Sequence, residues 1–470
     1  MGEVVIGGGG EEEERQLPLL RSSHESLRAP VKRTGNLWTA VAHIITGVIG
    51  SGVLSLAWSM AQLGWVAGPL CMLLFAAVTL ISTFLLCDCY MSPDPESGPD
   101  RHRSYLEAVQ IKLGDKSAWV CGAFVYVSLF GIGIAYTITS AISMRAIQKS
   151  NCYHKEGHEA ACDYGDAVYM LLFGAIQIVM SQIPNFHHMD WLSVVAATMS
   201  FTYSFIGLGL GLAKTIGDGY IKGSLRGVTA STAINKVWLV AQALGDIAFA
   251  YPYSLIVLEI QDTLTSPPPV SLTMKKASTM GIMITSLFYL LCGGFGYAAF
   301  GDDTPGNLLT GFGFYEPYWL IDFANACIVV HLVGGFQVYS QPLFGVVDRW
   351  LSEKFPDSGF INNQYLVQIP FLPTFKLNLF RLCFRTIYVA SGTAISMVFP
   401  YFNQVIGLIG ALNFWPLAIY FPVQMYITQR NIESWSNQWV ALQVFNVFCL
   451  GISIFGLTGS LEGLITEKLS

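Results

Sequence analysis

The sequence predicts an all-α polytopic membrane protein, and three observations support this fold class. First, 53% of the 470 residues are hydrophobic, only 12% are charged, and the mean hydropathy is +0.50. Soluble globular domains carry about 25% charged residues, so the composition favours a chain that lies largely in lipid. Second, apolar runs of about 20 residues, the length that crosses a bilayer as a helix, recur along the chain. Third, two of these runs are interrupted near their middle.

The segment before the first apolar run, residues 1–36, contains four consecutive glycines and four consecutive glutamates but no apolar block. Such a polar segment buries too little apolar surface to fold, so we expect a disordered cytoplasmic tail ahead of a transmembrane domain over 37–470. No cleavable signal-peptide pattern precedes the first apolar run, and we expect the first helix to serve as a retained signal anchor.

Eleven apolar runs define the predicted transmembrane helices, and Pro184, Pro267 to Pro269 and Pro400 help to place their ends. The predicted ranges are 37–63, 66–90, 118–148, 166–184, 189–213, 237–262, 274–300, 317–348, 379–399, 401–428 and 437–460.

The first interrupted run extends from Val41 to Trp65 and contains Gly50, Ser51 and Gly52 at its centre. In a bilayer, backbone groups stay unpaired only where they line a cavity or meet protein. One interpretation is a substrate site built from exposed backbone N–H and C=O groups, as in transporters with broken helices. The other is a contact of small residues with a neighbouring helix.

The second interrupted run lies in the predicted helix 237–262. Pro252 has no N–H to donate and clashes with the preceding turn, so it interrupts this helix between Tyr251 and Tyr253. A proline kink without function is the simpler interpretation. The position of the break, five helices after the first one, favours a functional interpretation.

An odd offset of five helices means that the two broken helices run in opposite directions, as an inverted-topology repeat requires. We therefore expect a five-plus-five inverted repeat in which helices one to five, 37–213, match helices six to ten, 237–428. The last helix, 437–460, lies outside the repeat. Spacing and interruption alone support this repeat, because the halves share no evident residue-level identity.

The distribution of basic residues predicts the orientation in the membrane. With a cytoplasmic N-terminus, seventeen of the 25 Lys and Arg residues fall in cytoplasmic segments and eight in extracellular ones. Cytoplasmic loops are enriched in Lys and Arg, so we expect a cytoplasmic N-terminus and an extracellular C-terminus. The loop 214–236, which holds four of the eight extracellular charges, argues against this orientation.

In that orientation Cys152 and Cys162 lie in the extracellular loop between the third and fourth helices, where disulfides form and persist. Their separation of ten residues closes without much strain, so we expect a disulfide bond between them. Two free loop thiols are the alternative. The other eight cysteines lie in or beside apolar runs, where buried thiols are ordinary.

The run from Lys32 to Pro69, KRTGNLWTAVAHIITGVIGSGVLSLAWSMAQLGWVAGP, closely resembles the opening of the plant amino acid permeases, which belong to the amino acid/auxin permease family. The similarity continues through 243–263, 296–335 and 411–427, so it covers nearly everything except the tail. This resemblance implies the five-plus-five inverted repeat of the amino acid/polyamine/organocation superfamily. It also implies proton-coupled uptake of amino acids across the plasma membrane, a substrate and an ion that composition and spacing do not show.

A zwitterionic amino acid needs donors for its carboxylate and acceptors for its ammonium group. Broken helices supply both, because half-helix N-termini are partly positive and C-terminal ends are partly negative. We expect the carboxylate at the N-terminus of the second half of helix one and the ammonium group at carbonyls beside both breaks. The hydroxyls of Ser51 and Tyr251 add hydrogen bonds to the substrate or bond within their own helices instead. The candidate residues are Ile49, Gly50, Ser51, Gly52, Val53, Phe249, Ala250 and Tyr251.

Three ionisable residues, His43, Asp246 and His331, lie in predicted helices whose spans contain no Lys or Arg. Charge in mid-membrane is costly, so such residues are candidates for function, and protonation that depends on the transport state couples proton entry to substrate movement. The resemblance favours the two histidines, which family members carry in matching runs. The alternative is a neutral histidine bonded to a backbone carbonyl. Thr46 stands about where sodium-coupled relatives tend to carry an asparagine, so the resemblance favours the proton.

We expect a transporter and not an enzyme, because the intramembrane His and Asp are scattered singly instead of forming a catalytic cluster. A channel would favour symmetric rings of carbonyls or charges. The chain has no CxxC and no Cys/His spacing typical of metal ligands, so we expect no metal and no cofactor beyond the proton. The net charge of −6 argues against a nucleic-acid partner and leaves the amino acid, the proton and the lipid bilayer. Alternative functions are import of auxin-like or other organic acids and a nutrient receptor that no longer transports.

Overall fold

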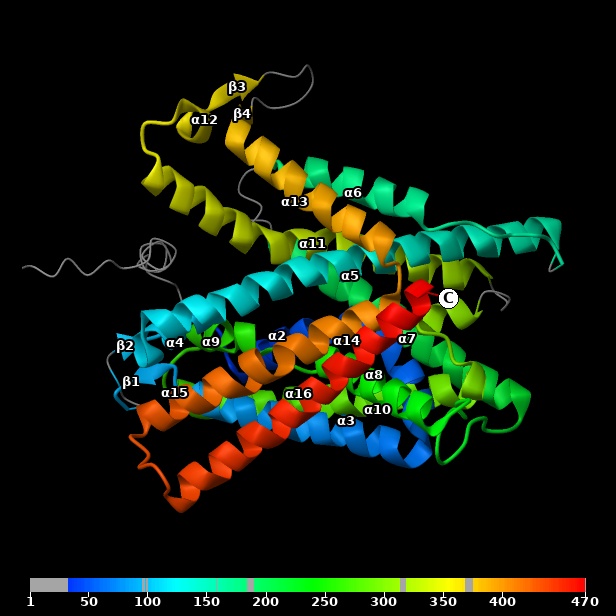
Figure 1. Cartoon of the computed structure of the whole chain (residues 1–470), viewed down its shortest axis with the longest axis horizontal. Coiled ribbons are helices and arrows are strands. Elements are labelled where there is room, and N and C mark those ends of the chain that lie inside the picture. Colours follow the sequence, from blue (N-terminus) through cyan, green and yellow to red (C-terminus); the bar gives the residue numbers. More distant parts are fainter. Residues whose placement is uncertain are drawn as a thin grey trace, which may run out of the picture.

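The computed structural model describes residues 33–469 except 95–97, 99, 158, 184–189, 313–317 and 368–374. The long elements of this part of the chain are all helices (Figure 1), and eight helical segments in it are long and apolar enough to cross a membrane. The prediction of an all-α polytopic membrane protein is therefore confirmed. Residues 1–32 of the predicted tail lie outside the described residues.

Helix occupies each of the eleven predicted ranges, and two short antiparallel β-ladders, β1–β2 and β3–β4, lie in loops. In chain order the elements are α2 (Leu37–Val48), η1 (Ser51–Ser55), α3 (Leu56–Asp88), β1 (Met91–Ser92), β2 (Asp100–Arg101), α4 (Tyr105–Leu113), α5 (Asp115–Glu156), α6 (Ala167–Ser181), α7 (Asp190–Asp218), α8 (Ala233–Ala250), α9 (Ser254–Asp262), α10 (Val270–Phe300), η3 (Gly301–Asp303), η4 (Leu308–Phe312), α11 (Tyr318–Lys354), α12 (Gly359–Asn362), β3 (Tyr365–Val367), β4 (Phe375–Leu377), α13 (Leu379–Val398), α14 (Phe402–Asn413), η5 (Phe414–Tyr420), α15 (Phe421–Gln429) and α16 (Asn437–Leu469).

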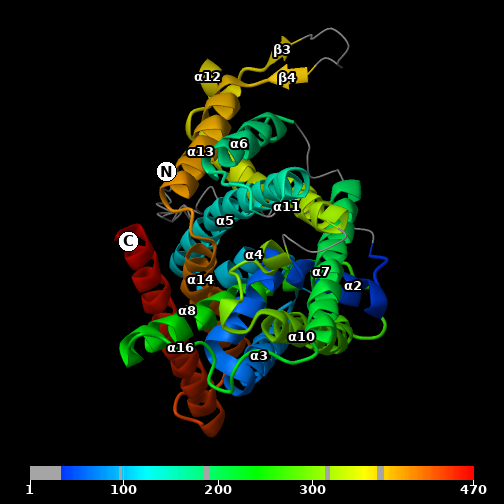
Figure 2. The same cartoon turned by 90° about the vertical axis from the view of Figure 1, so that its right-hand side faces the viewer.

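The helices pack in two groups, which Figure 2 shows one above the other. In one group α3, α8, α10, α14 and α16 form a connected set of contacts, and in the other α5, α6, α11 and α13 do so. Helix α7 packs on α10 and α11, and α14 contacts α5, so both connect the two groups. The loop after α11, with α12 and the β3–β4 hairpin, projects away from the helices (Figure 1).

Both predicted helix breaks are present. Helix α2 begins at a capping box, in which the side chain of Asn36 accepts hydrogen bonds from backbone N–H groups of the first turn, and it ends at Val48. Gly50 is extended (φ −135°, ψ −151°), and the chain resumes a helical path in η1. Around Pro252, α8 ends at Ala250 and α9 begins four residues later.

The first two predicted helices are joined without a loop, which the sequence did not predict. Helix α3 runs through both ranges and kinks at Gly64, whose φ of +82° is a conformation that favours glycine. A Cβ atom on Gly64 would lie 2.3 Å from the backbone nitrogen of Gly227, in the loop after α7. The N–H of Val228, in the same loop, donates to the carbonyl of Ala61 (2.8 Å). Backbone therefore packs directly on backbone at this kink.

A third interruption, also absent from the predictions, lies in the π-helical segment η5 between α14 and α15. Pro422 has no N–H to offer to the carbonyls four and five residues before it. Those two carbonyls accept side-chain hydroxyls instead, Leu417 from Tyr105 (2.5 Å) and Ala418 from Ser82. The backbone groups freed by this proline are thus satisfied within the protein.

An ion-paired cluster lies at the end of the molecule where the described chain begins. Arg33 contacts the carboxylate of Asp262 at 2.8 Å, and Gly35 forms a β-bridge with Leu264. The hydroxyl of Tyr90 donates to the same carboxylate (2.5 Å). The last residues of the predicted tail therefore pack against the end of α9.

Candidate functional site

A cavity of about 150 Å³ lies where the two helix breaks meet. Its walls come from both helix groups and from η5. No Asp, Glu, Lys, Arg or His is among the described residues that line it, so the lining has neutral side chains and backbone groups only. The lining residues are Gly47, Val48, Gly50, Ser51, Gly52, Ser128, Ile132, Tyr136, Ala248, Phe249, Ala250, Pro252, Tyr253, Ser254, Leu255, Ile256, Tyr339, Ile409, Gly410, Asn413, Phe414, Leu417 and Ala418.

The first break presents the N-terminus of η1 to this cavity. The first N–H groups of a helix have no partner within the helix. The N–H of Val53 bonds to the carbonyl of Gly50 (3.3 Å), which leaves the N–H groups of Ser51 and Gly52 at the helix N-terminus. The two breaks are in close contact here, because a Cβ atom on Gly52 would lie 3.0 Å from the Cα of Ala250. This end is therefore a partly positive, anion-favouring wall.

The second break presents the C-terminal end of α8. Because Pro252 has no N–H, the chain leaves carbonyl groups of the last turn of α8 without their usual helical partner. Such a C-terminal end is partly negative and favours a cation. The two breaks therefore place opposite partial charges around one cavity without burying a full charge.

One side chain, which was not predicted from the sequence, joins the two breaks. Tyr289 of α10 is fully buried, and its hydroxyl lies 2.6 Å from the carbonyl oxygen of Val48 and 3.2 Å from that of Ala250. Its ring packs edge-on against the ring of Tyr251 at 5.2 Å. The hydroxyl thus lies within hydrogen-bond distance of one carbonyl at each break. The carbonyl of Ala250 is one of the predicted acceptors for the ammonium group of the substrate.

The predicted substrate residues divide into two sets. Five of them line the cavity, namely Gly50, Ser51, Gly52, Phe249 and Ala250. The other three do not line it and are buried in the surrounding protein, namely Ile49, Val53 and Tyr251. Their roles in substrate binding remain predictions.

Asp246, one of the predicted proton-coupling residues, is fully buried on α8 about one turn before the second break. The side-chain amide of Asn403 donates to its Oδ2 at 2.8 Å. Its Oδ1 has no hydrogen-bond partner in the described part of the chain. The carboxyl therefore lies behind the cavity wall instead of lining it.

The two predicted histidines lie on other helices and also do not line the cavity. His331 on α11 is buried, with Nδ1 2.8 Å from the carbonyl of Ala196 and the ring edge-on to Tyr203 at 5.8 Å. This is the bond to a backbone carbonyl that the alternative interpretation describes. His43 lies on an exposed face of α2. Their coupling roles remain predictions.

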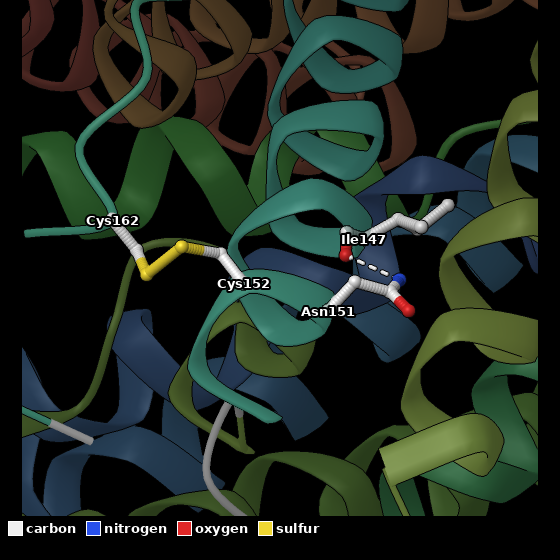
Figure 3. The surroundings of a disulfide bond; sticks show 4 residues. All are labelled: Ile147, Asn151, Cys152 and Cys162. Carbon is white, nitrogen blue, oxygen red and sulfur yellow. Dashed lines mark hydrogen bonds between the residues drawn. A yellow bond between two sulfur atoms is a disulfide. The ribbon is translucent and has the colours of Figure 1, made fainter. Parts of the chain in front are cut away.

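The predicted disulfide between Cys152 and Cys162 is present (Figure 3), with the two Cα atoms 6.0 Å apart. It ties the last turns of α5 to the loop that follows. Beside it, the amide of Asn151 donates to the carbonyl of Ile147 in the same helix and to the carboxylate of Asp322 on α11 (2.9 Å). The end of α5 is thus fixed to both its own loop and a neighbouring helix.

A multi-pass helical protein with one cavity at two broken helices has the architecture of a membrane transporter. The chain belongs to the transmembrane amino acid transporter protein family, whose model matches residues 33–466. This result confirms the resemblance to the plant amino acid permeases seen in the sequence.

Relatives of the chain carry matching names. It is 60% identical over 449 residues to "Probable amino acid permease 7" of Arabidopsis thaliana, covering 95% of this chain and 96% of the relative. It is 55% identical to "Amino acid permease 3" of the same plant, covering 93% and 92%. A more distant relative, "Lysine histidine transporter-like 6", is 28% identical. These names are those of permeases and transporters, in agreement with the prediction of a protein that is not an enzyme.

Among solved structures, the chain is similar to MHP1, a nucleobase-cation-symport-1 family transporter in a closed conformation with bromovinylhydantoin bound. The TM-score is 0.51, the identity is 14%, and the match covers 93% of this chain and 92% of that one. At this identity the similarity supports a common fold and carries no information on substrate.

Proposed function

We propose that this protein is a proton-coupled amino acid symporter that imports amino acids across the plasma membrane by alternating access. The observation that carries the proposal is the meeting of two broken helices at one cavity, with helix N-terminal N–H groups on one side and C-terminal carbonyls on the other. That pairing matches the two charges of a zwitterion. The names of the relatives supply the substrate class.

The substrate carboxylate binds the N–H groups of Ser51 and Gly52 at the start of η1. The ammonium group binds carbonyls beside the breaks. Since the hydroxyl of Tyr289 already contacts the carbonyls of Val48 and Ala250, the carbonyl of Phe249, which lines the cavity, is the better candidate for the ammonium group. Because no charged side chain is among the described lining residues, these backbone groups are the ones proposed to bind the charged groups of the substrate.

The proposal includes eleven transmembrane helices, a five-plus-five inverted repeat and a cytoplasmic N-terminus. The helical content of all eleven ranges and the matching breaks in α2–α3 and α8–α9 support the repeat. The distribution of basic residues supports the orientation, as does the disulfide, which would then lie on the oxidising extracellular side. In this orientation the Arg33 cluster closes the cytoplasmic end.

The coupling ion is the proton, and Asp246, His331 and His43 are the residues proposed to carry it. Of these, Asp246 lies nearest in sequence to a break. No cofactor takes part.

The test is uptake of labelled amino acids by an uptake-deficient host that expresses the full chain, at acidic and neutral external pH, with and without sodium. We expect uptake that rises at acidic pH and needs no sodium. Uptake that requires sodium and ignores pH would contradict proton coupling. Uptake of organic acids such as auxin, without amino acids, would favour the alternative function.

A pair of glycine variants tests the site itself. In Gly52→Leu the new side chain meets Ala250, because even a Cβ atom lies 3.0 Å from its Cα, so we expect loss of uptake at normal surface expression. Gly451→Leu on α16 is the matched control, since no atom lies within 4 Å of its added Cβ. Normal uptake by Gly52→Leu would contradict the assigned site.

A further inference from the structure

A buried polar cluster lies behind the second break, between α8, α14 and α16. Its members are Asp246 and Gln242 of α8, Asn403 of α14 and Ser460 of α16, all at most 7% exposed. Three of their polar atoms have no hydrogen-bond partner in the described part of the chain: Asp246 Oδ1, Gln242 Nε2 and Ser460 Oγ. Buried polar atoms are rarely left unpaired, because the loss of hydration is costly. The cluster therefore needs a further explanation.

Two of the unpaired atoms border the same small space, which a glycine keeps open. A Cβ atom on Gly407 of α14 would lie 2.8 Å from Asp246 Oδ1 and 2.6 Å from Ser460 Oγ. A Cβ atom on Gly245 would lie 3.0 Å from Ser460 Oγ. The carboxyl of Asp246 on α8 and the hydroxyl of Ser460 on α16 thus both border one position on α14 that carries no side chain.

In the described part of the chain, no charged side chain on the helices packed against α8 compensates a negative charge on Asp246. Helix α14 and η1 contain no charged residue. The charged residues of α3, α16 and the rest of α8 lie toward helix ends and are exposed or bonded elsewhere: Asp88, Glu462, Glu467, Lys468 and Lys236. A carboxylate buried without a partner charge is strongly disfavoured. The small ligand of this cluster is therefore a proton bound to the carboxyl group of Asp246.

We propose that Asp246 and Ser460 form the site that binds the coupling proton, and that α16, which lies outside the predicted repeat, supplies half of it. This inference rests on the proposed function and names the site of its coupling ion. In the proton-bound state the two oxygens, which form no hydrogen bond in the described structure, come together so that Oδ1–H donates to Ser460 Oγ while Asn403 holds Oδ2. When the proton leaves Oδ1 for water, the carboxylate keeps the negative charge and the Ser460 hydroxyl turns to donate to it. Ser460 is a positioning residue.

The cluster is connected to the cavity through two backbones. Asp246 lies about one turn before Ala250, which lines the cavity. On the facing helix, a Cβ atom on Gly410 would lie 2.5 Å from the backbone nitrogen of Phe249, so α14 rests directly on the last turn of α8. A change of charge at Asp246 therefore acts on the helix contact that also forms the cavity wall.

The experiment uses the purified full chain in proteoliposomes and two assays: net uptake of a labelled amino acid driven by an inward proton gradient, and exchange of labelled for unlabelled amino acid at equal pH. Asp246→Asn keeps the shape of the site but cannot take up and release the proton. We expect its net uptake to fall at least tenfold and its exchange to stay within threefold of the original chain, since exchange needs no net proton movement.

Ser460→Ala tests the second half of the site. The hydroxyl bonds more strongly to the carboxylate than to the neutral acid, because charge-assisted hydrogen bonds are stronger. Its loss should raise the proton affinity about fivefold, which moves the pH midpoint of net uptake about 0.7 unit toward alkaline pH. Thr458→Val, on the exposed face of the same helix, is the matched control and should keep the original midpoint.

A net uptake by Asp246→Asn with the original pH dependence would overturn the inference, and so would an unchanged midpoint in Ser460→Ala. If Asp246→Asn loses both activities, the Ser460→Ala midpoint decides. An unaltered chain that exchanges amino acids but shows no proton-driven uptake contradicts the proton coupling of the proposed function. One that exchanges no amino acid contradicts that function as a whole.

Discussion

Replacement of Tyr289 by Phe is the most direct test of how the two breaks are held together. The change removes one oxygen and keeps the ring that packs against Tyr251. The lost hydroxyl lies 2.6 Å from the carbonyl of Val48 and 3.2 Å from that of Ala250, so its single proton is shared and favours the shorter contact. The carbonyl of Val48 is a group that the first break deprives of its helical partner.

The expected loss of free energy follows from the burial of the carbonyl that the hydroxyl contacts. A buried carbonyl left without a donor costs about 1–3 kcal/mol, more than the net value of the hydrogen bond itself. If the substrate binds the state in which Tyr289 spans both breaks, the same free energy appears as weaker binding. A change of about 1–3 kcal/mol corresponds to a factor of about 5 to 150 in an equilibrium constant. We therefore expect Tyr289→Phe to raise the KM for amino acid uptake at least fivefold.

The assay is the concentration dependence of labelled uptake, normalised to the amount of protein at the cell surface. Tyr297→Phe is the matched control on the same helix, because its hydroxyl bonds to the backbone of Ser224 in the loop after α7 and does not bridge the breaks. We expect its KM to stay within twofold of the original. A Tyr289→Phe variant with normal surface expression and a KM within twofold of the original would refute the reasoning.

Three further changes test other parts of the structure. Cys152→Ser opens the bond to Cys162, and because that bond closes a short loop we expect a loss of about 3 kcal/mol, seen as a lower melting temperature without reductant. Gly227→Ala places a Cβ atom 2.4 Å from a backbone carbonyl at a φ of +73°, so we expect little correctly folded protein by size-exclusion chromatography. Asp262→Asn removes the charge that closes one end, and we expect faster exchange at equal pH with an unchanged KM.

The helix breaks could be predicted because their cause is local. Pro252 lacks an N–H wherever it stands, and two glycines around Ser51 remove the side chains that favour a continuous helix. The same reasoning applied to Pro416 and Pro422, six residues apart in one predicted helix, would have indicated an interruption where the structure has the π-helical segment. Likewise Ser104 and Glu107, which form a capping box, mark the start of α4, a helix too short for a search for spanning runs.

Other features depend on which face of a helix a residue occupies, and the sequence of an apolar helix does not define that face. Buried Tyr289 and exposed His43 both stand among apolar neighbours, and helices in lipid are apolar all round. Ser460 could not be linked to Asp246, because the two lie on helices far apart in the chain. Contacts of this kind arise from tertiary packing alone.

The three interruptions differ in how the chain treats the backbone groups they release, and this difference separates structure from function. At η5 the hydroxyls of Tyr105 and Ser82 cap the two released carbonyls, so that interruption shapes a wall and offers these groups to no ligand. At the first break, Ser51 and Gly52 line a cavity of about 150 Å³ instead, and their N–H groups stand at the helix N-terminus. Unpaired backbone groups in a membrane are costly unless something binds them. Among the three interruptions in the described part of the chain, the two breaks are therefore the ones where a substrate can recover this free energy, which is why we place recognition of its charged groups there.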